Sequence, residues 1–203
     1  MTQTSPTTTA VIVLAAGAGT RMRSKTPKIL HTIAGRSLLG HALHAAGDLG
    51  AAHVIAVVGH ERERVTAAVE STSQALGIPV SVAVQDQPLG TGDAARAGLS
   101  VLPDDFTGTV VVTAADVPLL NGPTLRALVE THSANGGAAV TVTGFHAADP
   151  TGYGRIVRDD DGGVHAIVEH KDASPEQLAI TEVNAGVYAC LLYTSDAADE
   201  GLG

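Results

Sequence analysis

The stretch Leu14-Ala15-Ala16-Gly17-Ala18-Gly19-Thr20-Arg21-Met22, closed by Pro27-Lys28, decides the fold. It follows the apolar run at residues 10–13, which predicts a buried strand, and it precedes a helical pattern. The two glycines let the backbone turn tightly and expose N–H groups, and Arg21 and Lys28 add fixed positive charge. A turn of this composition between a strand and a helix indicates a polyphosphate site.

Two commoner phosphate loops do not fit this stretch. The dinucleotide fingerprint requires a third small residue where Met22 stands, which argues against a nicotinamide-dependent redox enzyme. The Gly-Lys-Ser/Thr of the Walker loop is absent. An ordinary Gly-rich turn with surface cations stays open as an alternative, and Pro27-Lys28 weighs against it.

The composition is that of a globular chain with an aliphatic core. Of the 203 residues, 44% are hydrophobic and 16% are charged, which excludes a disordered protein. Only 2% are aromatic, so Val, Ile, Leu and Ala must fill the core, as suits parallel strands covered by Ala-rich helices. The net charge of −9 argues against a nucleic-acid partner or a membrane surface, since both require basic faces.

Targeting signals are not evident. Residues 2–9 are polar, without a basic start or an apolar signal core, and no apolar run approaches the roughly 18 residues of a membrane span. We therefore expect a cytoplasmic protein. The one cysteine, Cys190, is expected to be a small buried apolar residue, since no histidine partner follows from its spacing.

Strand and helix patterns alternate through the first two thirds of the chain. This alternation with short connections predicts an α/β fold with a mostly parallel sheet flanked by helices. The expected strands cover residues 11–15, 54–58, 80–84 and 110–113, and the expected helices cover 37–49, 61–71, 93–102 and 124–132.

The pattern changes after residue 139. We expect a strand at 139–145, an antiparallel hairpin around the turn at 159–163, a helix starting at Ser174-Pro175, and a last strand at 182–191. Residues 1–9 are expected to be disordered, 10–191 to form one domain, and 192–203 to be an atypical tail.

Ligands of an open α/β sheet bind at the carboxyl ends of the strands, where Asp116 and Gln85 lie. Asp116 directly follows an apolar strand and suits Mg²⁺, although a turn or N-cap aspartate is an equal alternative. The Gln85 amide can meet a base edge, and the turn Gly90-Thr91-Gly92 lets backbone approach a flat ring. Thr91 could instead serve only as the N-cap of the next helix.

Three residues further along could bind sugar hydroxyls. Gly154 lies in a Gly-Tyr-Gly segment that indicates a constrained backbone, and Glu169 and Asn184 carry carboxylate and carboxamide groups. Each alone is more often a solvated charge or a turn residue. The nine histidines lack the spacing of a zinc site and are expected at the surface.

These motifs together resemble the sugar nucleotidyltransferases. The chain closely resembles the N-terminal pyrophosphorylase domain of the bacterial bifunctional N-acetylglucosamine-1-phosphate uridyltransferase/glucosamine-1-phosphate acetyltransferases, from about residue 11 to residue 189. Seven blocks in order carry the resemblance, at residues 14–22, 27–35, 89–92, 116–119, 149–156, 167–173 and 182–186. It implies a Rossmann-like nucleotidyltransferase fold and a homotrimer formed through a β-helix domain absent from this chain.

The resemblance also implies roles for individual residues. Leu14, Ala15, Ala16 and Gly17 would hold the nucleotide phosphates, with Arg21 and Lys28 as the catalytic cations. Gln85, Gly90 and Thr91 would read uracil, Asp116 would bind Mg²⁺, and Gly154, Glu169 and Asn184 would contact N-acetylglucosamine. The implied reaction transfers UMP from UTP to N-acetyl-α-D-glucosamine 1-phosphate and releases pyrophosphate, a step in peptidoglycan and lipopolysaccharide precursor synthesis.

Three departures from the family pattern keep alternatives open. Ala115 replaces the usual glycine before the aspartate and is expected to crowd the nucleotide, and Asp93 stands where histidine is common. The chain also stops before the family's later asparagine ligand to Mg²⁺. A nucleotide-binding fragment without turnover, or a transferase for another sugar or base, therefore remains a second hypothesis.

Overall fold

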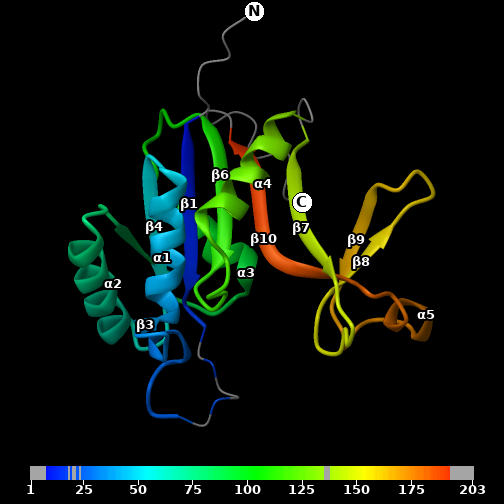
Figure 1. Ribbon diagram of the computed structural model, residues 1–203, viewed down its shortest axis with the longest axis horizontal. Helices are drawn as coiled ribbons and strands as arrows, with labels where there is room; N and C mark the ends of the chain where they lie inside the picture. The colour runs from blue at the N-terminus through cyan, green and yellow to red at the C-terminus, as the bar shows by residue number, and fades with distance from the viewer. Residues whose placement is uncertain (1–7, 18, 20–21, 23, 135–137, 193–203) are drawn as a thin grey trace, which may run out of the picture. The chain divides into compact units, whose positions relative to one another are not determined.

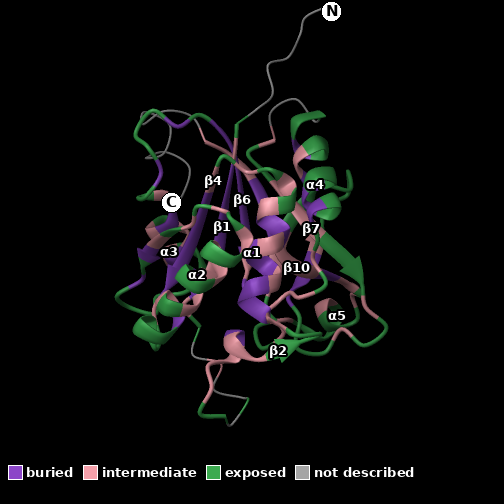
Figure 2. Ribbon diagram, turned by 60° about the vertical axis from the view of Figure 1, so that its left-hand side comes forward, coloured by how far each residue is buried: buried purple, intermediate pink, exposed green. Residues whose placement is uncertain are grey.

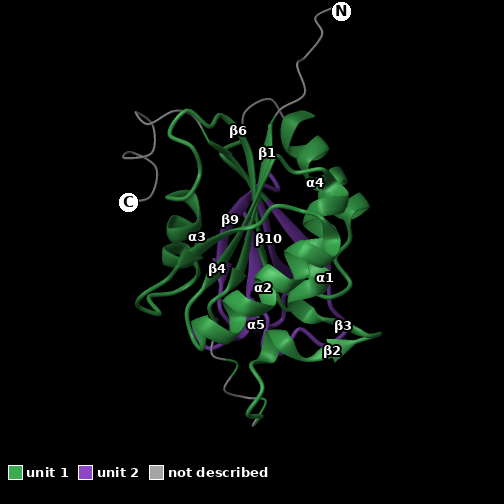
Figure 3. Ribbon diagram, turned by 90° about the vertical axis from the view of Figure 1, so that its left-hand side faces the viewer, with its two compact units in different colours: residues 1–141, 189–203 green, residues 142–188 purple. Residues whose placement is uncertain are grey.

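The computed structural model describes residues 8–17, 19, 22, 24–134 and 138–192. These residues form two compact units (Figure 3). The first comprises residues 1–141 with 189–203, and the second comprises residues 142–188. The expected disordered start and atypical tail fall almost wholly outside the described residues, and the assignment of 10–191 to one domain stays a prediction.

A parallel sheet forms the centre of the first unit (Figure 1). Its strands are β1 (Thr9–Ala15), β4 (His53–Val58), β5 (Ser81–Val84) and β6 (Gly108–Ala114), in the spatial order β5-β4-β1-β6. The register aligns Ile12 with Ile55 on one side and with Val112 on the other. Because β1 has a strand on both sides and helices on both faces, residues 10–13 are 0% exposed (Figure 2).

Helices cover both faces of this sheet. They are α1 (Leu38–Leu49), α2 (Arg62–Leu76), α3 (Thr91–Leu99) and α4 (Gly122–Ala134). Helix α1 packs against α2 and α4, while α3 covers the other face, against β1, β4 and β5 (Figure 3). Local signals set the ends of α1: the Ser37 side chain accepts a hydrogen bond from the Gly40 N–H, and Gly50 ends the helix at φ +79°.

Helix α3 lies close to β1 at Gly98. A Cβ at this position would stand 2.5 Å from Ile12 Cγ2, too close for a real contact. The glycine lowers helix propensity by about 1 kcal/mol, yet it lets the helix approach the strand. This contact fixes the helix whose first turn carries Thr91.

Three short elements join β1 to α1, and the sequence did not predict them. They are the 3₁₀ helix η2 (Lys28–Leu30) and the strands β2 (Thr32–Ile33) and β3 (Arg36–Ser37), which pair antiparallel. Ala34 and Gly35 form the turn, with φ values of +50° and +79°. Strands of two residues are too short to show an alternating pattern.

The second unit contains the predicted antiparallel hairpin. Its strands are β8 (Arg155–Arg158) and β9 (Val164–Val168), with Ile156 paired to Ile167. The helix α5 (Pro175–Leu178) begins with the expected Ser174 N-cap, here part of a full capping box. The strands β7 (Val140–His146) and β10 (Glu182–Leu192) begin in one unit and end in the other.

An exposed ion pair supports the second unit. The Arg158 guanidinium donates to both carboxylate oxygens of Glu182, at 2.8 and 2.6 Å. This hydrogen bonding lowers the pKa of the Glu182 carboxyl. The pair ties the hairpin to the first residue of β10.

One histidine contradicts the expectation of surface positions. His132 in α4 is only 3% exposed, and its Nδ1 lies 2.8 Å from the Thr141 hydroxyl. Burial lowers the pKa of His132, because the charged imidazolium loses its hydration. The helical spacing from Leu125 and Leu128 places it on the buried face, which sequence reasoning overlooked.

This buried imidazole makes stability depend on pH. The unfolded chain binds a proton at His132 below its ordinary pKa of 6.5, whereas the folded chain binds it only at lower pH. We therefore expect its contribution to be fully present above pH 6.5 and to be lost as the pH falls. Urea unfolding at several values from pH 8 to 5 should show a steeper loss for the wild type than for His132→Asn. Equal slopes would contradict the expectation.

None of the helices in the described part of the chain is long and apolar enough to cross a membrane.

Candidate active site

The carboxyl ends of the four parallel strands lie level at one edge of the sheet. Ala15 pairs with Val58, and Val58 pairs with Val84. The chain runs from β1 outward to β4 and β5 and then returns to β6 on the other side of β1. Such a reversal between neighbouring strands, here β1 and β6, marks the part of the sheet edge at which ligands of open α/β sheets bind.

The glycine loop after β1 lies at this edge. Gly19 adopts φ +58°, and a Cβ there would stand 2.6 Å from Lys28 Cβ, so only glycine lets the loop pass this close. Gly17 is exposed, with open space around it. Leu14 and Ala16 are partly exposed, whereas Ala15 is 1% exposed.

Lys28 and Asp116 meet beside this loop. The Lys28 ammonium donates to Asp116 Oδ2, although the two residues are 88 positions apart in the chain. Their side chains are 39% and 31% exposed, so both remain open to a ligand. The N–H of Ala115 donates to the Leu14 carbonyl at 2.9 Å, which holds the end of β6 against β1. Arg21, the second predicted cation, lies outside the described residues.

The donor set at this point fits Mg²⁺. Asp116 offers a hard carboxylate oxygen, and the described residues contain no group of three His, Cys, Asp or Glu side chains that could enclose a metal. Mg²⁺ binds nucleotides through one or two carboxylates together with phosphate oxygens and water, so it does not require such a group.

Gln85 follows β5 and contacts the start of α3. Its Nε2 donates to the Gly90 carbonyl at 3.1 Å and to Asp93 Oδ2 at 2.9 Å. Gly90 is the N-cap of α3 at φ +111°, and Thr91 is the first helical residue, with no capping bond. The alternative that Thr91 acts only as an N-cap is therefore wrong. The three predicted base-reading residues lie together, and the sequence missed Asp93 as their partner.

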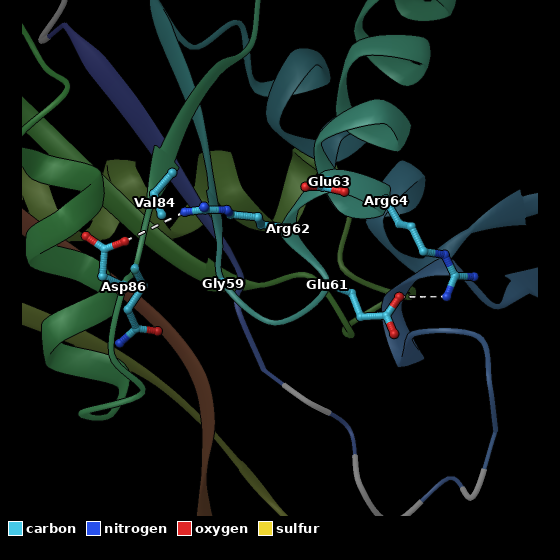
Figure 4. Close-up of a pocket in the computed structure, with 8 residues that line it drawn as sticks. Gly59, Glu61, Arg62, Glu63, Arg64, Val84 and Asp86 are labelled. Carbon is cyan, nitrogen blue, oxygen red and sulfur yellow. Dashed lines mark hydrogen bonds and ion pairs between the residues drawn. The ribbon is translucent and has the colours of Figure 1, made fainter.

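A pocket of about 490 Å³ opens beside this cluster (Figure 4). It is lined by Gly59, Glu61, Arg62, Glu63, Arg64, Val84, Gln85 and Asp86. The charged side chains in it largely pair with one another. Arg64 donates to Glu61 at 2.7 Å, and Arg62 lies 3.8 Å from Asp86 (Figure 4). Gln85 is the one lining residue that sequence reasoning singled out.

The second unit brings its three predicted residues together. The Asn184 N–H donates to the Gly154 carbonyl at 2.9 Å. A Cβ on Gly154 would stand 3.5 Å from Glu169 Oε1 and 3.8 Å from Asn184 Cβ. The Asn184 side chain is held by Tyr188 and by the Gly186 N–H, which fixes the direction of its amide. Glu169 is exposed and available to a ligand.

A buried arginine supports this second cluster. Arg155 is 1% exposed, and its guanidinium donates to the Tyr153 carbonyl and lies 3.3 Å from His170 Nδ1. Among the described residues, Nε has no hydrogen-bond partner. Arg155 thus links the residue before Gly154 with the residue after Glu169, a role that its place in the motif did not reveal.

Comparison with known proteins identifies the family. A family model described as "MobA-like NTP transferase domain" matches residues 11–161, which include the glycine loop, Lys28, Gln85 and Asp116. The chain belongs to this family. This NTP transferase chain is also 63% identical over 186 residues to a protein named "Bifunctional protein GlmU" from Rhodococcus opacus. Proteins of the same name from Nocardia farcinica and Mycobacterium sp. (strain KMS) are 61% and 60% identical.

The match covers 91% of the NTP transferase chain but only 37% of the Rhodococcus protein, so the chain spans about a third of that relative's length. Two solved structures share the fold. HddC from Yersinia pseudotuberculosis has a TM-score of 0.70 and 20% identity, and the match covers 90% of this chain and 76% of the HddC chain. A putative glucose-1-phosphate thymidylyltransferase from Bacillus anthracis has a TM-score of 0.69 and 18% identity, covering 90% and 71%.

Ala115 and Cys190 of the NTP transferase chain lie in packed positions. Ala115 is 0% exposed, so its methyl group packs inside the protein, and the expected crowding of a nucleotide has no support in this position. Cys190 is partly buried, and burial raises the pKa of its thiol. A raised thiol pKa agrees with the expectation of a packing residue and not a nucleophile.

Proposed function

We propose that this chain carries the uridylyl-transfer site of a GlmU-type protein. The reaction joins UTP and N-acetyl-α-D-glucosamine 1-phosphate to give UDP-N-acetylglucosamine and pyrophosphate. The observation that carries the proposal is the meeting of Lys28 and Asp116 beside the glycine loop, at the carboxyl ends of β1 and β6. The identity of 60–63% to proteins named GlmU supports the choice of this reaction.

The phosphates of UTP would lie along the glycine loop. Backbone N–H groups near Gly17 and Gly19 would donate to phosphate oxygens, with Arg21 and Lys28 neutralising their charge. Asp116 would hold Mg²⁺, which supplies positive charge to the phosphates when bound. Lys28 would exchange its contact with Asp116 for one with the pyrophosphate that leaves.

The chemical step needs positioning more than proton transfer. An oxygen of the sugar phosphate attacks the α-phosphorus of UTP, forming one P–O bond while the bond to the β-phosphate oxygen breaks. The electron pair of that bond leaves with pyrophosphate. No general base is required, because the attacking phosphate is already ionised. The rate then depends on in-line alignment and on charge neutralisation by Lys28, Arg21 and the Asp116 site.

Two clusters would set specificity. Gln85, Gly90 and Thr91 would contact uracil, since an amide and open backbone at a helix start can meet its polar edge. Gly154, Glu169 and Asn184 would contact N-acetylglucosamine, because their carboxylate, amide and backbone groups suit sugar hydroxyls.

Release of pyrophosphate tests the proposed reaction. The chain is expected to release it from UTP only with N-acetylglucosamine 1-phosphate and Mg²⁺, and much more slowly with glucose 1-phosphate or with CTP. Calorimetry with UTP and with UDP-N-acetylglucosamine separates binding from turnover. Binding without turnover would favour the nucleotide-binding fragment, and fast turnover with another sugar or base would favour a different transferase.

The cellular location, the pathway and the oligomeric state of the whole protein are also proposed from the resemblance. A protein containing this domain would act in the cytoplasm, supply precursors for peptidoglycan, and assemble as a homotrimer through a β-helix domain outside these 203 residues. Size measurement of a longer natural protein would test the trimer.

A further inference from the structure

The amide of Gln85 has its direction fixed by two oxygen atoms. Nε2 donates to the Gly90 carbonyl at 3.1 Å and to Asp93 Oδ2 at 2.9 Å, and the residue is 9% exposed. A carbonyl and an ionised carboxylate can only accept hydrogen bonds. Turning the amide over would place Oε1 against both oxygens, so the chemistry of the partners settles which end is nitrogen.

This arrangement leaves one defined group for a ligand. Both hydrogens of Nε2 are used, and Oε1 accepts no hydrogen bond from the described part of the chain. Gln85 therefore offers an acceptor and no donor. A free glutamine side chain would offer both and could match either kind of base edge.

We propose that Asp93 is a positioning residue that fixes Gln85 as an acceptor and thereby selects a base with a ring N–H. The inference rests on the proposed function, in which Gln85 contacts the base. Uracil presents N3–H, which can donate to Oε1. Cytosine presents a lone pair at N3, which would face the lone pairs of Oε1 and leave two acceptors unsatisfied.

Asp93 is suited to this task by its place as well as by its charge. It lies in the first turn of α3, three residues after Gly90, so both acceptors belong to one rigid helix start. A negative charge there is also favourable to the helix dipole. A histidine at this position could donate as well as accept, whereas a carboxylate can only accept.

Substitution of Asp93 tests the selection of the base. In Asp93→Ala, we expect the ratio of kcat/KM for UTP over CTP to fall about tenfold, the effect of losing one hydrogen bond to a charged group. The fall should come from a higher KM for UTP, with kcat at saturation nearly unchanged. Asp93→Asn should give an intermediate ratio, because its side-chain carbonyl still accepts.

Two further measurements separate positioning from a simple helix-start role. In ¹⁵N spectra of the wild type, both side-chain amide protons of Gln85 should exchange slowly with solvent. In Asp93→Ala, one of the two should exchange rapidly. The side-chain amide signals of Gln85 are assigned by their absence from the spectrum of Gln85→Ala. Glu176→Ala, which removes the first-turn acid of α5, is the matched control and should leave the UTP to CTP ratio unchanged.

The outcomes distinguish this inference from the proposed function. If the wild type is active and Asp93→Ala keeps the same ratio of kcat/KM for UTP over CTP, the role of Asp93 is overturned. The proposed transferase activity is then unaffected. The wild type could instead bind UTP in preference to CTP without any turnover. If Asp93→Ala then loses this binding preference, the result supports the role of Asp93 and overturns the proposed activity of this chain. Unchanged exchange of both Gln85 protons in Asp93→Ala also overturns the inference.

Discussion

Replacing Asp116 by asparagine is expected to lower the rate of Mg²⁺-dependent pyrophosphate release by about 100- to 1000-fold, the usual effect of removing one group that stabilises developing charge. The change keeps the size of the side chain but removes its negative charge. It therefore weakens the Mg²⁺ site and also leaves Lys28 without its ionic partner. Because the Asp116 side chain is 31% exposed, the fold should be little affected.

The assay is initial-rate release of pyrophosphate over a range of Mg²⁺ concentrations. Calorimetry of UTP binding with and without Mg²⁺ gives the same comparison without turnover, and the metal dependence should disappear in the variant. Asp104→Asn is the matched control, since Asp104 is an exposed aspartate between α3 and β6. An Asp116→Asn variant with more than a tenth of the wild-type rate would refute the assignment.

Replacing Leu43 by alanine should cost about 2 to 5 kcal/mol of unfolding free energy. Leu43 is 0% exposed in α1, the helix that packs against α2, α4 and β1. Removing its branched end loses apolar burial and leaves a cavity that rigid neighbours cannot fill. For a chain of this size, the melting temperature should fall by about 5 to 15 °C.

Urea unfolding followed by circular dichroism measures this loss. Leu119→Ala is the control, because Leu119 is 89% exposed and its removal should change stability by less than about 0.5 kcal/mol. Similar losses in the two variants would show that α1 does not form the core described here.

Local signals in the sequence were enough to predict most of the regular elements. The apolar run at residues 10–13 indicated β1 because a strand between two others is buried on both faces. Apolar residues at helical spacing over 37–49 indicated α1, and Ser174-Pro175 marked the start of α5. The hairpin turn at 159–163 was equally local. Helix ends were less certain, since α2 runs to Leu76, five residues beyond its expected end at 71.

The candidate site was predicted partly by position and partly by resemblance. Asp116 and Gln85 were found because they follow apolar strands, and the carboxyl ends of parallel strands meet at one edge. The carboxylate of Glu169 and the carboxamide of Asn184 suggested contacts with sugar hydroxyls, but only the resemblance assigned these residues to N-acetylglucosamine, because neither has a distinctive local pattern. The functions of all these residues remain predictions.

The sequence by itself determined most of the strands and helices along the chain, the glycine loop and the family, since these depend on patterns within a few residues. Only the tertiary structure decided which distant groups meet. It brought Lys28 to Asp116, turned Asp93 onto the Gln85 amide, and buried His132 beside Thr141. The physical reason is that such contacts depend on how the helices pack on the sheet, and that packing involves residues far apart in the chain.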